Sequence, residues 1–108
     1  YTLRATRKPS KTTIVAHGGG YIASGAVGND KMPVLLDEEL AFYTTEGAGE
    51  VQTPLAMPKN HYAIGDSITL RHAKAGELCE RFQVLHAYRG DDYVGPMTTY
   101  RGEGQCFL

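Results

Sequence analysis

The side chains best suited to chemistry gather in one short stretch that contains His72, Lys74 and Cys79. If a strand runs through Lys74, then His72 and Lys74 point from the same face, because side chains alternate along a strand. A neutral imidazole and a thiolate are good ligands for zinc and related divalent metals. A metal site needs three or four ligands, so the others would have to come from His17, Glu77 or another domain. The alternative hypothesis is that His72 is an ordinary hydrogen-bonded histidine.

Two further segments are similar to hydrolase motifs but lack the partners that those motifs need. The residues from His17 to Tyr21 read His-Gly-Gly-Gly-Tyr, as in the oxyanion-hole loop of lipase-type esterases. The Gly-x-Ser-x-Gly nucleophile motif is absent, and 108 residues are too few for an α/β-hydrolase sheet. Residues 65–68 resemble a second hydrolase motif, but Ser67 would begin a strand instead of ending one. We interpret the first segment as a glycine loop that permits close backbone contact or positive φ, and the second as a turn.

The elements that must position these residues are expected to be strands. Glycine and proline residues interrupt the chain every eight to twelve residues or so, and runs rich in Val, Ile, Thr, Tyr and Phe lie between them. Ile68 and Leu70 alternate with polar residues, as a half-buried strand requires. Residues 89–92, Arg-Gly-Asp-Asp, predict a hairpin turn rather than an adhesion signal. The predicted strands are Tyr1–Thr6, Thr12–Ala16, Leu40–Thr45, Glu50–Pro54, Ser67–His72, Phe82–Tyr88 and Tyr93–Tyr100.

Helical pattern is scarce in this sequence. Asp37–Phe42 could form one helical turn, and Ala73–Arg81 has a helix-compatible composition, but both segments are short for a helix. We therefore predict a single domain over residues 1–108 that is all-β, or β with one or two short helical turns. The strands are expected to form a small barrel or a sandwich.

The composition is that of an ordinary globular protein, and it argues against two classes of partner. The formal net charge is -1, so the basic surface of a nucleic-acid-binding protein is not expected. No apolar run approaches the roughly 20 residues that cross a bilayer, and no signal peptide is visible. Cys79 and Cys106 are expected to be reduced thiols, as in a cytoplasmic protein. The sequence starts at Tyr1 inside an expected strand, which favours a fragment of a larger enzyme.

Four segments, in order along the chain, resemble one enzyme family. They are Ala-His-Gly-Gly-Gly-Tyr at Ala16–Tyr21, Gly-Glu-Val-Gln-Thr-Pro at Gly49–Pro54, His-Ala-Lys-Ala-Gly-Glu-Leu at His72–Leu78, and Thr-Tyr-Arg-Gly-Glu-Gly at Thr99–Gly104. Together they are similar to the C-terminal β-domain of the D-serine dehydratase and D-threonine aldolase-like proteins. Those proteins are pyridoxal-phosphate enzymes of the alanine-racemase type, also called fold type III.

The resemblance implies a preceding (β/α)₈ barrel that is not in this chain. That barrel would carry the lysine that forms a Schiff base with pyridoxal phosphate, so no residue of this chain is expected to bind the cofactor. The C-terminal domain would close over the mouth of the barrel, commonly at a homodimer interface, and complete the pocket for a small D-amino acid. By itself the chain is expected to be inactive.

The resemblance also implies a divalent metal, zinc or manganese, that acts as a Lewis acid on the substrate hydroxyl. His72 matches the family's histidine ligand, but Lys74 occupies the second ligand position, and an ammonium group is a poor ligand. Lys74 could replace the metal's charge by pairing with the substrate, or Cys79 or Glu77 could supply the lost ligand. His72 and Lys74 are therefore the candidate catalytic residues, and His72 and Cys79 are the candidate metal ligands.

The leading hypothesis is the C-terminal domain of a pyridoxal-phosphate-dependent D-amino-acid lyase, aldolase or deaminase. The alternative is a freestanding β-barrel that acts as a binding or interaction module without catalysis. A third hypothesis is a small metal-dependent hydrolase built on His17, His72 and Cys79.

A domain separated from its partner should expose a large apolar face. We expect Arg71 and Arg101 to form surface ion pairs rather than to bind an anionic substrate. The expected lining of the apolar face is Tyr21, Phe42, Tyr43 and Tyr100.

Overall fold

The chain divides into two compact units. The computed structural model describes residues 1–26 and 28–107, and the contacts between residues separate Tyr1–Ala73 from Lys74–Leu108. Strands dominate both units, and the helical segments are very short. This confirms the prediction of an all-β protein with one or two short helical turns.

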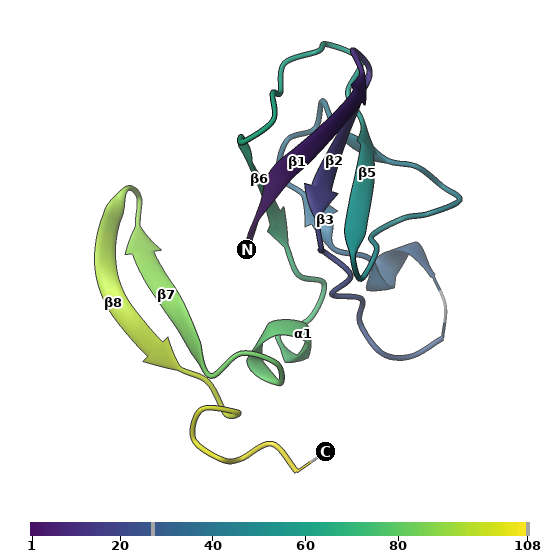
Figure 1. Ribbon diagram of the computed structural model, residues 1–108. Helices are drawn as coiled ribbons and strands as arrows, with labels where there is room; N and C mark the ends of the chain where they lie inside the picture. The colour runs from purple at the N-terminus through teal and green to yellow at the C-terminus, as the bar shows by residue number, and fades with distance from the viewer. Residues whose placement is uncertain (27, 108) are drawn as a thin grey trace. The chain divides into compact units, whose positions relative to one another are not determined.

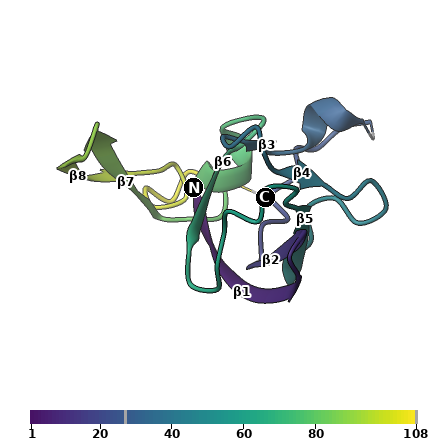
Figure 2. The ribbon, with the colours of Figure 1, turned by 90° about the horizontal axis from the view of Figure 1, so that it is seen from above.

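The first unit is a curved antiparallel sheet. Its six strands, labelled in Figure 1, are β1 (Thr2–Ser10), β2 (Thr13–His17), β3 (Val34–Leu35), β4 (Ala41–Phe42), β5 (Gln52–Ala56) and β6 (Ser67–Arg71). The strand order is β3-β6-β1-β2-β5-β4, and every neighbouring pair is antiparallel. Seen from above, the strands curve into a nearly closed barrel, and the short strands β3 and β4 are the two ends of the sheet (Figure 2).

Alternation of apolar residues decides which face of this sheet packs inward. In β6, Ile68 and Leu70 are buried while Thr69 and Arg71 are exposed, as the sequence predicts for a half-buried strand. Such side chains meet in one core inside the curved sheet. The buried core residues are Leu3, Ala5, Ile14, Ala16, Leu40, Leu55, Met57, Ile68 and Leu70.

The second unit contains one helical turn and one hairpin. The helix α1 (Gly76–Cys79) lies inside the segment of helix-compatible composition, and it is followed by β7 (Val84–Arg89) and β8 (Asp92–Thr98) (Figure 1). Arg89 pairs with Asp92, so the hairpin loop is Gly90 and Asp91, and Gly90 has a φ of 61°. Positive φ at the first loop position suits the tight turns that join antiparallel strands. The predicted hairpin turn is confirmed.

The region around β3 and β4 differs from the prediction. The predicted helical turn at 37–42 is wrong, because the Asp37 carboxylate accepts the backbone N–H of Glu39 at 2.8 Å and holds a tight turn that leads into β4. The predicted strand Leu40–Thr45 is shortened to Ala41–Phe42, since the chain turns again where the Tyr43 carbonyl accepts the backbone N–H of Gly47 at 2.7 Å.

Two short elements in this region were not predicted at all. They are β3 and the 3₁₀ turn η1 (Asn29–Lys31), and their two or three residues are too few to show any periodicity. In the part of the chain that the structure describes, no helix is long and apolar enough to cross a membrane.

Candidate functional site

His72 lies directly after the last residue of β6. The strand ends at Arg71, so the expectation that it continues through Lys74, with His72 and Lys74 on one face, is wrong. The His72 residue is half-buried, and its Nδ1 atom is buried without a hydrogen-bond partner among the described residues. Buried polar atoms of this kind are rare in proteins and carry a cost in free energy. The alternative hypothesis of an ordinary hydrogen-bonded histidine therefore does not hold for Nδ1 of His72 within the described residues.

Lys74, Glu77 and Cys79 belong to the second unit, whereas His72 belongs to the first. The Glu77 carboxylate is buried and accepts the backbone N–H of Lys74 at 2.8 Å, so it holds the chain at the start of α1. Glu77 therefore has a structural role at the start of α1. Lys74 is exposed, and its ammonium group has no ion-pair or hydrogen-bond partner within residues 1–26 and 28–107. Cys79 is a half-buried free thiol.

The described residues contain no group of three metal-binding side chains. No three His, Cys, Asp or Glu residues within residues 1–26 and 28–107 come close enough together to hold an ion. This set includes His17, which lies exposed at the end of β2, and also His72 and Cys79. A complete metal centre, either for the resemblance or for the hydrolase hypothesis, would therefore need ligands from outside the described chain.

The glycine loop after β2 has a structural role. The Thr53 hydroxyl donates to the Gly18 carbonyl oxygen at 2.6 Å and accepts the backbone N–H of Gly49 at 3.1 Å. A Cβ atom on Gly20 would lie 2.8 Å from the Glu50 nitrogen and 2.9 Å from the Gly49 carbonyl carbon. The two backbones thus approach to a distance that only glycine permits, as the sequence predicted.

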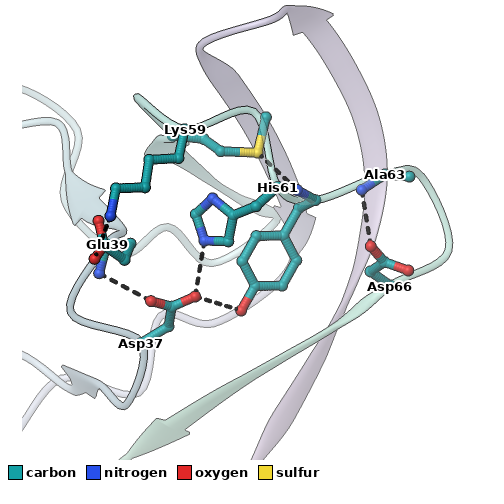
Figure 3. Close-up of polar contacts among 8 residues, drawn as sticks. Asp37, Glu39, Lys59, His61, Ala63 and Asp66 are labelled. Atoms are coloured by element: carbon teal, nitrogen blue, oxygen red, sulfur yellow. Dashed lines mark hydrogen bonds and ion pairs between the residues drawn. The ribbon is translucent and has the colours of Figure 1, made fainter.

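A polar network that the sequence did not predict joins two loops of the first unit (Figure 3). One oxygen of Asp37 accepts the Tyr62 hydroxyl at 2.8 Å and lies 2.9 Å from Nε2 of His61. The Asp37 side chain is 27% exposed and that of His61 30%, so the network is partly shielded from water. Lys59 and Glu39 form a second ion pair at 2.9 Å, but both side chains are well exposed and contribute little to stability.

The network shifts the pKa values of two of its members in opposite directions. The backbone N–H of Glu39, followed by the hydrogen bonds from His61 and Tyr62, holds the pKa of Asp37 below its ordinary value of 3.8. Burial and the hydrogen bond to the Asp37 carboxylate raise the pKa of Tyr62 to about 12. Asp37 is therefore a carboxylate and Tyr62 a neutral donor over the whole neutral range.

The role of this network follows from the position of Asp37 in the chain. Asp37 lies in the loop that connects β3 to β4, the two ends of the sheet, while His61 and Tyr62 lie in the loop between β5 and β6. The hydrogen bonds between the two loops therefore hold the β3–β4 loop in place at the opening of the barrel. We call this set of contacts the Asp37 network.

An apolar hollow lies at the same opening, and we call it the seam groove. Its volume is about 550 Å³, within the range of clefts that bind ligands. Both end strands of the sheet contribute to it, so it lies where the barrel remains open. Its lining is Asn29, Met32, Pro33, Val34, Leu35, Leu40, Ala41, Phe42, Tyr43, Thr44, Thr45, Glu46 and Gly47.

The predicted apolar face is only partly recovered. Phe42 and Tyr43 line the seam groove, whereas Tyr21 packs edge-on against Tyr1 with ring centres 5.0 Å apart, and Tyr100 belongs to the second unit. The most exposed apolar side chains of a strand lie on the hairpin instead. They are Tyr88, Tyr93, Val94 and Met97, each more than half exposed.

Within residues 1–26 and 28–107, Arg101 does not form the predicted ion pair. Arg101 and Tyr100 take part in local contacts of the second unit. The Arg101 guanidinium donates to the Glu80 carbonyl oxygen, and to the sulfur of Cys106 at 3.4 Å. Partial burial, with the thiols and carboxylates around it, raises the pKa of Tyr100. Arg71 is exposed and has no ion-pair partner within residues 1–26 and 28–107.

The comparisons with known proteins leave the family of this chain open. No protein-family model matches the sequence, and no curated protein matches it.

Proposed function

We propose that this chain is the C-terminal β-domain of a pyridoxal-phosphate-dependent enzyme that acts on a small D-amino acid, in a lyase, aldolase or deaminase reaction. Its role would be to complete the substrate pocket of a preceding barrel domain and to contribute to a homodimer interface. The proposal starts from the four family-like segments, and the barrel-like all-β fold of the first unit agrees with it.

One observation carries the proposal, which is the unpartnered ring nitrogen of His72. This histidine is the residue that the resemblance assigns to the substrate side of the domain, and Nδ1 is its buried atom without a partner. A substrate hydroxyl or another group from outside the described chain would supply that partner. The new hydrogen bond would remove the free-energy cost of a buried nitrogen without a partner. Lys74, an exposed cation two residues after His72 in the sequence, is suited to attract the carboxylate of an amino acid.

The described residues do not fit a complete metal site, so no step of the proposed reaction is assigned to a metal. His72 offers one imidazole nitrogen, but Lys74 is a poor ligand, and no three ligating side chains come together in the described residues. Pyridoxal phosphate, held by the barrel, would act as the electron sink of the reaction. The residues of this chain would bind and orient the substrate, with His72 holding or moving a proton at the substrate hydroxyl.

The exposed hairpin supports the part of the proposal that concerns partners. A two-stranded hairpin is only marginally stable by itself in water, and β7 and β8 pair only with each other in the described chain. The rings of Tyr88 and Tyr93 contact each other at a tilted angle with their centres 5.3 Å apart, although each residue is more than half exposed. Contact with a barrel domain or with a second subunit would cover these aromatic rings.

The second candidate function is a freestanding binding module without catalysis, and the seam groove favours it. The two functions are distinguished by the coding sequence upstream of the codon for Tyr1. The proposed enzyme requires an in-frame (β/α)₈ barrel there, with a lysine for the Schiff base. A start codon next to Tyr1, with no barrel before it, would refute the enzyme and leave the binding module.

A further inference from the structure

The seam groove is bounded by two strand edges that lack partners. Within the described residues, β3 pairs only with β6, and β4 pairs only with β5, so one edge of each strand is unpaired. Val34 and Leu35 of β3 line the groove, and so do Ala41 and Phe42 of β4. Unpaired backbone N–H and C=O groups at a strand edge are a template for a further extended chain.

Within the described residues, β3 and β4 do not pair with each other. The connection from Leu36 to Leu40 joins the two strands, and the Asp37 network ties that connection to the loop that carries Tyr62. The opening is therefore a built feature of the unit, with a volume of about 550 Å³ that suits a few residues of extended chain. The half-exposed Val34 side chain, at 43% exposure, shows that the β3 side of the groove is accessible.

The chemistry of the lining limits what can occupy the groove. Most of the lining side chains are apolar, and Glu46 is the only charged residue among them. The Glu46 carboxylate has no ion-pair or hydrogen-bond partner among residues 1–26 and 28–107. A complementary occupant would thus present apolar side chains to the groove and a cation to Glu46.

We infer that the seam groove binds an extended peptide segment of a partner protein, with alternating apolar side chains and one lysine or arginine, which adds a strand at the unpaired edge of β3 or β4. This mode of recognition obtains affinity from backbone hydrogen bonds and specificity from every second side chain. The inference depends on the first unit alone and does not depend on the proposed enzymatic function.

The test is a titration of the full 108-residue chain with three synthetic peptides, followed by fluorescence anisotropy. The first peptide alternates valine and threonine and ends in lysine. The second ends in glutamate instead. The third repeats the first with N-methyl groups on alternate residues, which removes backbone donors and keeps the side chains. We expect the first to bind best, with about fivefold weaker binding for the second and about tenfold or more for the third.

Two pairs of variants locate the binding site on the chain. Val34→Asp is expected to weaken binding of the lysine peptide, whereas Val51→Asp, at a position 72% exposed and outside the groove, should not. Glu46→Lys should reverse the preference between the lysine and glutamate peptides, and Glu103→Lys, with the same charge change, should leave it unaltered. Circular dichroism shows whether each variant is folded. If Val34→Asp does not fold, the Glu46→Lys variant still tests the inference.

Three results would overturn the inference. One is equal binding of the N-methylated and unmodified peptides, because the groove would then recognise apolar side chains without adding a strand. Another is an unchanged peptide preference in folded Glu46→Lys. The third is the absence of binding by any of the three peptides to the folded chain.

Discussion

Replacing Gly20 by alanine is expected to destabilise the first unit by about 3 kcal/mol, which is a large part of the 5–15 kcal/mol that stabilises a typical domain. The added Cβ would lie 2.8 Å from the Glu50 nitrogen and 2.9 Å from the Gly49 carbonyl carbon. Both neighbours are backbone atoms, so the clash cannot be relieved by rotating a side chain. Urea denaturation, followed by circular dichroism, measures the change.

Gly28→Ala is the matched control for this experiment. A Cβ at Gly28 would meet mainly the Asp30 carboxylate, at 2.6 Å, and that flexible side chain can move away. The backbone at Gly28 is extended, with a φ of -178°, so alanine causes no conformational strain there. Equal stability of the two variants would contradict the close backbone contact that we assign to the glycine loop.

Asp37→Ala is expected to cost about 2 kcal/mol at neutral pH, because it removes the acceptor for Tyr62, for His61 and for the backbone N–H of Glu39. The cost depends on pH with a defined sign. The pKa of Asp37 is lower in the folded state than its ordinary value of 3.8, so its contribution is complete above about pH 4 and is lost as pH falls through the lower folded value. Urea midpoints of the wild type and the variant should therefore converge in acid.

The contribution of Tyr62 to stability depends on pH in the opposite direction, because it is lost as the pH rises. The pKa of Tyr62 is raised from 10.0 to about 12 in the folded state, so its contribution is present below pH 10 and is lost between pH 10 and 12. Tyr62→Phe should remove this alkaline loss and leave the acid behaviour dependent on Asp37. A constant difference between wild type and Asp37→Ala from pH 2 to pH 8 would show that the network does not titrate as described.

Runs rich in Val, Ile, Thr, Tyr and Phe between glycines and prolines predicted the longer strands, and alternation of apolar residues predicted the buried face of β6. Ile68 and Leu70 in β6 are buried as predicted, and the loop at Gly90 has the predicted hairpin geometry. The two hydrolase-like segments were also interpreted correctly. Gly65 and Asp66 form a turn, in which the Asp66 carboxylate accepts the Ala63 N–H at 2.8 Å before β6 begins.

The seam groove and the Asp37 network could not be predicted from the sequence. Their strands have only two residues each, and pairing at β3 and β4 depends on neighbours that are distant in the chain. Asp37 and Tyr62 are 25 residues apart, and no local pattern connects a loop aspartate to a loop tyrosine. The one local signal was an Asp two residues before Glu39, which is typical of a side chain that holds a turn.

The strand that leads to His72 was predicted correctly, but its extent beyond His72 was not. His72 is at the end of a strand as expected, yet the strand stops before Lys74 can share its face. The strand length depends on pairing with β1 and β3, and the pairs with both neighbours end by Arg71. Sequence periodicity does not report where such pairing ends.

The kinetics of a His72→Ala variant measure whether His72 acts on the substrate. They are measured in the longer polypeptide that the proposed function requires, with D-serine and D-threonine as substrates and Thr69→Ala, at an exposed position of β6, as the control. If His72 holds or moves a proton at the substrate, kcat falls by about 100-fold or more, and the pH profile of kcat/KM loses one ionisation. Thr69→Ala should leave both kcat and the pH profile of kcat/KM unchanged. A His72→Ala enzyme that is folded and has an unchanged kcat and pH profile would contradict the account.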